Sequence, residues 1–272
     1  MTIYVNLKFG EAEPLEPQLD FILERGLAPE LRLSAAVLDA FTPERHRAIA
    51  ERIAWAGVRP SVHLPHEDVL PGARDELVRR AAVKRLVRAM EVARIYDAAL
   101  MVGHANLLLD FYGGTHAAWL SQSVKTWSEV LKTWPEAPPL YIENVHETSP
   151  EPLAGLMREL SGRDVGICFD VGHWHFFASG SVRLDLARWL DALGPWIGHV
   201  HLHDNRGMAD DHRGPGAGGI DFGAFFRAMD ERGIHAGATF EPHGQDALLT
   251  CLAFIENHPD RFPVEPEVVK AL

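Results

Sequence analysis

Six short segments of the chain carry histidines and carboxylates at the ends of apolar runs. They are SVHLPH (61–66), MVGHAN (101–106), YIENVHE (141–147), GICFDVGHWH (166–175), GHVHLHDN (198–205) and TFEPH (239–243). Carboxylate and imidazole groups can bind divalent cations, and imidazole exchanges protons near neutral pH. The sequence therefore contains candidates for a metal site or an acid–base site, provided that the fold brings these segments together.

The segments alternate with stretches of helical period in a regular βα pattern. Strands are predicted at residues 3–7, 31–37, 61–64, 99–104, 140–144, 166–170, 198–203 and 238–241. Helices are predicted at residues 14–25, 43–56, 74–96, 115–134, 150–160, 184–193, 222–232 and 246–257, with a tail at 259–272. Eight such units in 272 residues predict a single α/β domain over residues 1–272, a closed (β/α)8 TIM barrel. A doubly wound open sheet is the competitor, but Gly10-Glu11-Ala12-Glu13 is not the glycine-rich turn expected there.

The strand ends of such a barrel should present polar groups to one opening, because alternate strand residues face inward and active sites form at the carboxyl ends. The residues expected to face inward are Glu143, Asp170, His199, His201, His203 and Glu241. Their apolar neighbours are expected to face the helices: Ile142, Phe169, Val200, Leu202 and Phe240. Like charges gathered in a confined site are costly unless they are neutralised, so we predict a bound divalent metal. Separate buried salt bridges are the alternative, and alternation does not choose among the three histidines.

Taken in order, these segments resemble the xylose isomerase-like TIM-barrel superfamily of sugar phosphate isomerases and epimerases, which is related to the endonuclease IV family. The most specific stretch is HVHLHDN followed by DDHRGPGAGGIDF (210–222), and the resemblance covers nearly the whole chain. It implies a single-metal site formed by Glu143, Asp170, His201 and Glu241. Further residues stand where the endonuclease branch places ligands of a three-zinc cluster: His63, His104, His173, Asp210 and His212. We expect one metal, or one tight and one weak, with the trinuclear cluster as the alternative.

The resemblance implies an isomerase or epimerase of a keto-sugar or its phosphate. In that mechanism a metal-stabilised enediolate forms while Glu143 and Glu241 remove and return protons as the catalytic carboxylates. The donor set suits Mn²⁺, Mg²⁺, Co²⁺ or Zn²⁺, and no organic cofactor is expected. The expected substrate-binding residues are His63, His104, His173 and Arg206. The runner-up is a zinc-cluster phosphodiester hydrolase of the endonuclease IV (AP endonuclease) type.

Composition restricts the partners. The formal net charge is −12, from 38 acids and 26 bases, which weighs against broad attraction to nucleic acid or anionic lipid. The amino terminus resembles no secretory signal, no apolar run approaches the roughly 20 residues of a membrane span, and two cysteines are too few for a disulfide framework. We therefore expect a cytoplasmic protein that acts on a small carbohydrate and binds neither nucleic acid nor membrane. Because barrels often pair, a homo-oligomer is left open.

The other histidines and the tryptophans give weaker expectations. Four histidines lie just beyond strand ends, and for each of them a place in the pocket and a place on the surface are equally expected: His66, His146, His175 and His243. Four in helical or connecting stretches are expected to be exposed: His46, His116, His235 and His258. Helix packing is expected for Trp119, Trp127 and Trp134, and core or rim packing for Trp174. Cys168 is expected to be a buried core thiol.

Overall fold

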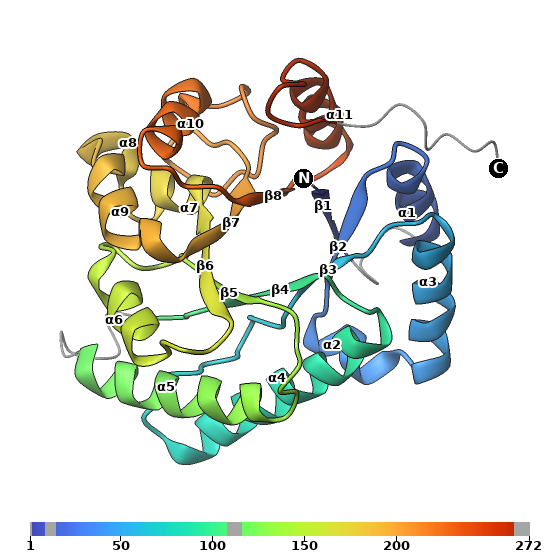
Figure 1. Ribbon diagram of the computed structural model, residues 1–272, viewed down its shortest axis with the longest axis vertical. Coiled ribbons are helices and arrows are strands. Elements are labelled where there is room, and N and C mark those ends of the chain that lie inside the picture. The colour runs from blue at the N-terminus through green and yellow to red at the C-terminus, as the bar shows by residue number, and fades with distance from the viewer. Residues whose placement is uncertain (1, 9–14, 108–115, 264–272) are drawn as a thin grey trace.

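Eight parallel strands form an inner ring with the helices outside it (Figure 1), in a computed structural model that describes residues 2–8, 15–107 and 116–263. The strands are β1 (Ile3–Lys8), β2 (Ala28–Arg32), β3 (Ser61–His63), β4 (Leu100–His104), β5 (Leu140–Glu143), β6 (Val165–Asp170), β7 (Ile197–Leu202) and β8 (Gly237–Phe240). Each strand pairs with the next, and β8 pairs with β1, so the sheet closes in the order of the sequence. The predicted (β/α)8 barrel is confirmed.

Helices follow the strands in the expected alternation. They are α1 (Leu15–Leu23), α2 (Ala35–Ala40), α3 (Pro43–Trp55), α4 (Glu76–Ile95), α5 (His116–Lys132), α6 (Glu151–Glu159), α7 (Val171–Phe176), α8 (Gly180–Arg183), α9 (Leu186–Leu193), the 3₁₀ turn η2 (Gly194–Trp196), α10 (Phe222–Asp230) and α11 (Gln245–Glu256). Parts of four expectations lie outside the described residues: the turn at 10–13, helix positions 14 and 115, and tail residues 264–272. None of the helices within the described ranges is long and apolar enough to cross a bilayer.

The second strand differs from its prediction. It was expected at residues 31–37, but β2 begins at Ala28 and ends at Arg32. The Ser34 side chain accepts a hydrogen bond from the backbone N–H of Val37 and starts α2, so the apolar residues after it belong to a helix. The earlier start of β2 brings Glu30 into register with Asn6 of β1 and Ser61 of β3. Because the predicted strand began at residue 31, the inward-facing carboxylate of Glu30 was missed in the sequence.

Two short helices after β6 were also not predicted. The carboxylate of Asp170 accepts a hydrogen bond from the backbone N–H of His173 at 2.6 Å, which caps α7 directly at the end of the strand. The segment 171–176 contains no helical apolar period long enough to reveal this turn. The cap holds Asp170 and His173 on adjacent elements at the mouth of the barrel.

The core between strands and helices follows the predicted alternation. Phe169 is fully buried and stacks on Phe225 of α10 with ring centroids 6.0 Å apart. Phe240 meets Phe262 edge-on at 5.2 Å, after α11. Ile142 also belongs to this main core. The neighbours of these residues along each strand therefore face the barrel interior.

A second, smaller apolar cluster fills the interior itself. It consists of Tyr4, Ala28, Leu100, Val102 and Cys168, and we call it the plug. Tyr4, Ala28, Val102 and Cys168 each precede, by two positions on their strand, a polar residue that faces the same interior. The plug therefore forms the layer beneath these polar residues, and the expectation of a buried Cys168 thiol is confirmed.

His46 was wrongly expected to be exposed. It is fully buried on α3, and its Nδ1 lies 2.9 Å from the hydroxyl of Tyr96 at the end of α4. His235 and His258 are exposed and His116 is partly exposed. Trp119 and Trp127 are fully buried, as expected for helix packing. A histidine on a helix can thus be buried when it hydrogen-bonds to a residue about fifty positions away in the sequence. The hydrophobic periodicity of the helix alone does not reveal such a partner.

Candidate metal centre and its pocket

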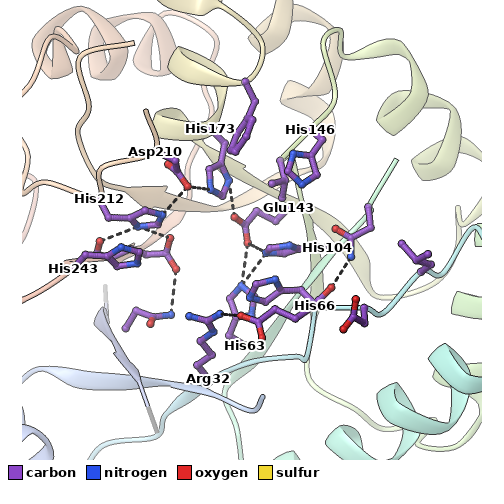
Figure 2. Close-up of a pocket in the computed structure, with 18 residues that line it drawn as sticks. Arg32, His63, His66, His104, Glu143, His146, His173, Asp210, His212 and His243 are labelled. Carbon is purple, nitrogen blue, oxygen red and sulfur yellow. Dashed lines mark hydrogen bonds and ion pairs between the residues drawn. The ribbon is translucent and has the colours of Figure 1, made fainter. Parts of the chain in front are cut away.

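A cavity of about 610 Å³ opens at the carboxyl ends of the strands. Figure 2 shows the histidines and carboxylates of its wall pointing toward one another from different strand ends. Most candidate site residues line it: His63, His104, Glu143, His173, Asp210, His212 and Glu241. Asp170 and His201 are fully buried and complete the cluster without lining the cavity.

The four residues of the expected single-metal site converge, and we call them the central group: Glu143, Asp170, His201 and Glu241. One ligand atom from each lies within 4.8 Å of the others. The Nδ1 atom of His201 is 3.5 Å from Oε2 of Glu143 and 3.4 Å from Oε1 of Glu241. The Oδ2 atom of Asp170 is 3.9 Å from the same nitrogen.

The central group also passes a chemical test for a cation. Within the described residues, Oδ2 of Asp170 and both ring nitrogens of His201 are buried without a hydrogen-bond partner. Such atoms are costly to bury unsatisfied. Three carboxylates and an imidazole facing one point match the donors of a divalent-metal site, so the residues fit a bound ion.

The three inner-face histidines in β7 and directly after it lie in different surroundings. His199 is 2.7 Å from Oγ1 of Thr239 through Nε2 and meets the plug residue Tyr4 edge-on. His201 belongs to the central group. His203 lies 3.1 Å from Oδ1 of Asp170 through Nε2. The structure thus brings His201, and not its neighbours, to the point shared by the three carboxylates.

A second group of imidazoles flanks Glu143, and it consists of His63, His66 and His104. The Nε2 atoms of His63 and His104 lie 3.2 Å and 3.1 Å from Oε2 of Glu143. His66, left between pocket and surface by the sequence, stacks on His104 with centroids 4.2 Å apart and lines the cavity. Glu143 therefore connects this group to the central group.

A third group lies on the other side of Asp170, and it consists of His173, His203, Asp210 and His212. Oδ2 of Asp210 is 3.4 Å from Nε2 of His173 and 3.1 Å from Nε2 of His212. His203 stacks face to face on His212 with centroids 3.7 Å apart. The structure therefore gathers all nine positions named by the resemblance, and adds His66 and His203 to them.

The pKa values of the buried groups are set by opposition between burial and neighbouring charge. Burial alone would raise the pKa of Glu143, but the charges of His104 and His201 hold it well below its usual range. Burial alone would lower the pKa of His201, but the charges of Glu241, Glu30 and Glu143 raise it well above the usual value. Protons therefore balance the carboxylates when metal is absent, and a binding cation would displace them.

Of the remaining residues considered in the sequence, some line the cavity and others do not. Arg206 is exposed and is not among the residues that line the cavity, and its expected role in substrate binding stays a prediction. His146 and His243 line the cavity, whereas His175 bonds through Nδ1 to Oδ1 of Asn205 at 2.8 Å. Trp174 is buried and donates to Asp185, as expected for packing.

Several residues of the site were missed by the sequence reading. Glu30 is fully buried beneath the central group, and Asn6 donates to both Glu30 and Glu241. Arg32 and Phe177 line the cavity. Alternation in β2 would have identified Glu30 and Arg32 had the strand been started at Ala28.

Residues 28–263 match the family of xylose isomerase-like TIM barrels. The chain belongs to this family. Among its relatives by sequence is the uncharacterised protein MJ1311 of Methanocaldococcus jannaschii, 27% identical over 179 residues. That match covers 63% of this chain and spans 60% of the length of MJ1311.

Solved structures of other xylose isomerase-like barrels share the fold. A D-tagatose 3-epimerase-like protein superposes with a TM-score of 0.78 at 24% identity, over 96% of this chain and 98% of its own. The TTHB071 protein of Thermus thermophilus, from a crystal soaked with ZnCl2, gives 0.74 at 25% identity, over 94% and 97%. Endonuclease IV of Thermus thermophilus gives 0.65 at 18% identity, over 94% and 100%.

Proposed function

We propose that this protein is a divalent-metal-dependent isomerase or epimerase of a keto-sugar or sugar phosphate. The observation that carries the proposal is the position of the central group beside a cavity of about 610 Å³. Pockets for small molecules commonly measure about 300–1,000 Å³, so the cavity suits a ligand of monosaccharide size. The shared fold of a D-tagatose 3-epimerase-like protein is compatible with this class of substrate.

The central group would hold the metal through Glu143, Asp170, His201 and Glu241. When bound, the ion supplies Lewis-acid polarisation of a carbonyl oxygen. The donor set, rich in carboxylate, suits Mn²⁺, Mg²⁺, Co²⁺ or Zn²⁺. The chain itself must then move a proton at the carbon next to that carbonyl.

Two carboxylates are placed for this proton transfer, and they differ in how fully their oxygens are engaged. Both oxygens of Glu143 face histidines, at 3.0 Å from His173 and 3.1 Å from His104. Glu241 accepts from Asn6 through Oε1, but its only polar contact through Oε2 among the described residues is to Nδ1 of His212 at 3.7 Å. Glu241 therefore offers the freer oxygen to a substrate, while Glu143, from β5, approaches from another side of the barrel.

The test is substitution of Glu241 by Gln, which keeps the shape and one oxygen but removes the anionic base. Metal-saturated Glu241→Gln should lose at least about 10²-fold in turnover, because a positioned acid–base group contributes about that much. Turnover is measured on a panel of ketopentoses, ketohexoses and their phosphates in D2O, by deuterium uptake and by product formation. Uptake without net epimerisation would assign proton removal to Glu143.

The matched control is Glu67→Gln, at an exposed glutamate of the same cavity that pairs with Arg32 at 2.7 Å. It changes the same charge without touching the central group and should alter turnover only a few-fold. Near-normal turnover in metal-saturated Glu241→Gln would reduce Glu241 to a ligand. The mechanism with two proton-transferring carboxylates would then be wrong.

A second candidate function is favoured by the second and third groups, which extend the central group on both sides through Glu143 and Asp170. Three adjacent ions would suit a zinc-cluster phosphodiester hydrolase, and endonuclease IV of Thermus thermophilus shares the fold. The net charge of −12 and the acidic pair Glu67-Asp68 at the cavity oppose binding to DNA.

Metal counting and DNA binding separate the two candidates. We expect one to two tightly held ions per chain and no binding of abasic duplex DNA tighter than the roughly 10⁻⁴–10⁻⁶ M of non-specific association. Three tightly held zinc ions, together with incision at an abasic site, would select the hydrolase.

A further inference from the structure

A buried glutamate on β2 faces the side of His201 that points away from the carboxylates of the central group. Nδ1 of His201 faces those carboxylates, at 3.4 Å from Glu241 and 3.5 Å from Glu143. Nε2, on the opposite side of the ring, lies 3.4 Å from Oε1 of Glu30. Glu30 and His201 are both fully inaccessible to solvent.

Three other strands of the barrel hold the Glu30 carboxylate in place. Asn6 of β1 donates from Nδ2 to Oε1 at 2.9 Å. Ser61 of β3 and Thr239 of β8 donate from their hydroxyls to Oε2, at 3.0 Å and 2.9 Å. Oε1 is thus the oxygen turned toward His201, and hydrogen bonds from the other strands restrict its movement.

A carboxylate in this position decides which nitrogen of His201 is available to a cation. An imidazole that binds a metal through one nitrogen carries its proton on the other, and an acceptor for that proton fixes the tautomer and the ring plane. The 3.4 Å separation is about 0.5 Å longer than an ordinary N–H···O bond, a gap that a small tilt of the ring closes. His199 lacks this arrangement, because its Nε2 bonds to the hydroxyl of Thr239.

We propose that Glu30 is a positioning residue of the metal centre, which holds His201 with Nε2–H toward β2 and Nδ1 toward the ion. Asn6 extends the same support to Glu241, since its amide donates to Oε1 of Glu30 and to Oε1 of Glu241. Two ligands of the central group are therefore oriented by side chains of β1 and β2, of which Glu30 is fully buried and Asn6 lines the cavity. The inference rests on the metal centre of the proposed function.

The first test compares Glu30→Gln with Ser61→Ala in protein stripped of metal. Glu30→Gln removes the charge that faces His201, whereas Ser61→Ala removes one donor from Oε2 and leaves Oε1 intact. Calorimetric titration with Mn²⁺ should give a Kd about 10–100-fold weaker for Glu30→Gln, the range typical of lost support behind a ligating histidine. Ser61→Ala should weaken binding by less than Glu30→Gln does, because Thr239 still donates to Oε2 and Oε1 keeps its charge toward His201. The thermal midpoints of the metal-free variants show whether any loss comes from general destabilisation.

A second measurement needs no change at Glu30. In zinc-loaded wild-type protein, ¹⁵N NMR should show His201 protonated at Nε2, with His201→Gln assigning the signal. Protonation at Nδ1 would overturn the proposal, as would a Glu30→Gln Kd within about 3-fold of wild type. Failure of wild-type protein to bind any divalent ion would instead refute the metal centre itself.

Discussion

A methyl group added at Gly172 tests whether the third group depends on the position of His203. Gly172 lies in α7, and a Cβ built on it would fall 2.1 Å from Cε1 and 2.4 Å from Nε2 of the His203 ring. Non-bonded carbon contacts are favourable at about 3.5–4.0 Å, so the ring must retreat by roughly 1 Å or more. Its stacking on His212 at 3.7 Å restricts that retreat.

The expected magnitude follows from two opposing effects. Alanine is favoured over glycine inside a helix by about 1 kcal/mol, whereas overpacking a buried site costs about 1–3 kcal/mol. Gly172→Ala should therefore lower the free energy of unfolding by up to about 2 kcal/mol. The same displacement lengthens the contacts from Nε2 of His203 to Asp170 and Asp210, now 3.1 Å and 3.8 Å, so zinc held by the third group should be lost.

Gly155→Ala is the matched control, because Gly155 lies inside α6 with its nearest added contact, Leu120, at an ordinary 3.7 Å. It should stabilise the protein by up to about 1 kcal/mol and leave metal binding unchanged. Urea unfolding of chelator-treated protein gives the stabilities, and elemental analysis gives the zinc content. If Gly172→Ala matches Gly155→Ala in both, the steric reasoning about His203 is refuted.

Two further predictions concern pH and metal removal. Burial holds the pKa of His46 below its ordinary value, so on acidification below about 6.5 the unfolded chain takes up the proton first. The free energy of unfolding should then fall by up to about 1.4 kcal/mol per pH unit through this residue, and urea titrations at pH 7 and 5 should show that component absent in His46→Gln. Stripping the metal with EDTA should lower the thermal midpoint, since an ion at 100 times its Kd contributes about 2.7 kcal/mol. A midpoint insensitive both to chelator and to added Mn²⁺ or Zn²⁺ would contradict the metal centre.

The sequence specified the barrel and the inward faces of its strands because both depend on short-range patterns. Ile142, Phe169 and Phe240 alternate with Glu143, Asp170 and Glu241, and period-two alternation is a property of each strand alone. The choice among the histidines in β7 and directly after it is different. It depends on the register in which each strand pairs with its neighbour.

That register is set by the pairing of adjacent strands, which are far apart in the sequence. The register between β6 and β7 shifts at Ile167/Cys168 and brings Asp170 opposite His201. Glu30 was missed for a related reason, since only pairing with Asn6 shows that β2 has already begun at that point. His46 was misjudged because its partner, Tyr96, lies on another helix. Contacts between distant segments decided each of these positions.

The plug has a kinetic consequence. Tyr4, Leu100 and Cys168 are at most 9% exposed, so within the described residues the plug closes the barrel interior below the central group. In the proposed function, metal and substrate would therefore both enter through the cavity at the carboxyl ends of the strands. A substrate bound in that cavity would lie between the ion and the solvent, so the ion would leave only after the product. Under the proposed function, we therefore expect protein that is turning over substrate to lose its metal to a chelator more slowly than protein without substrate.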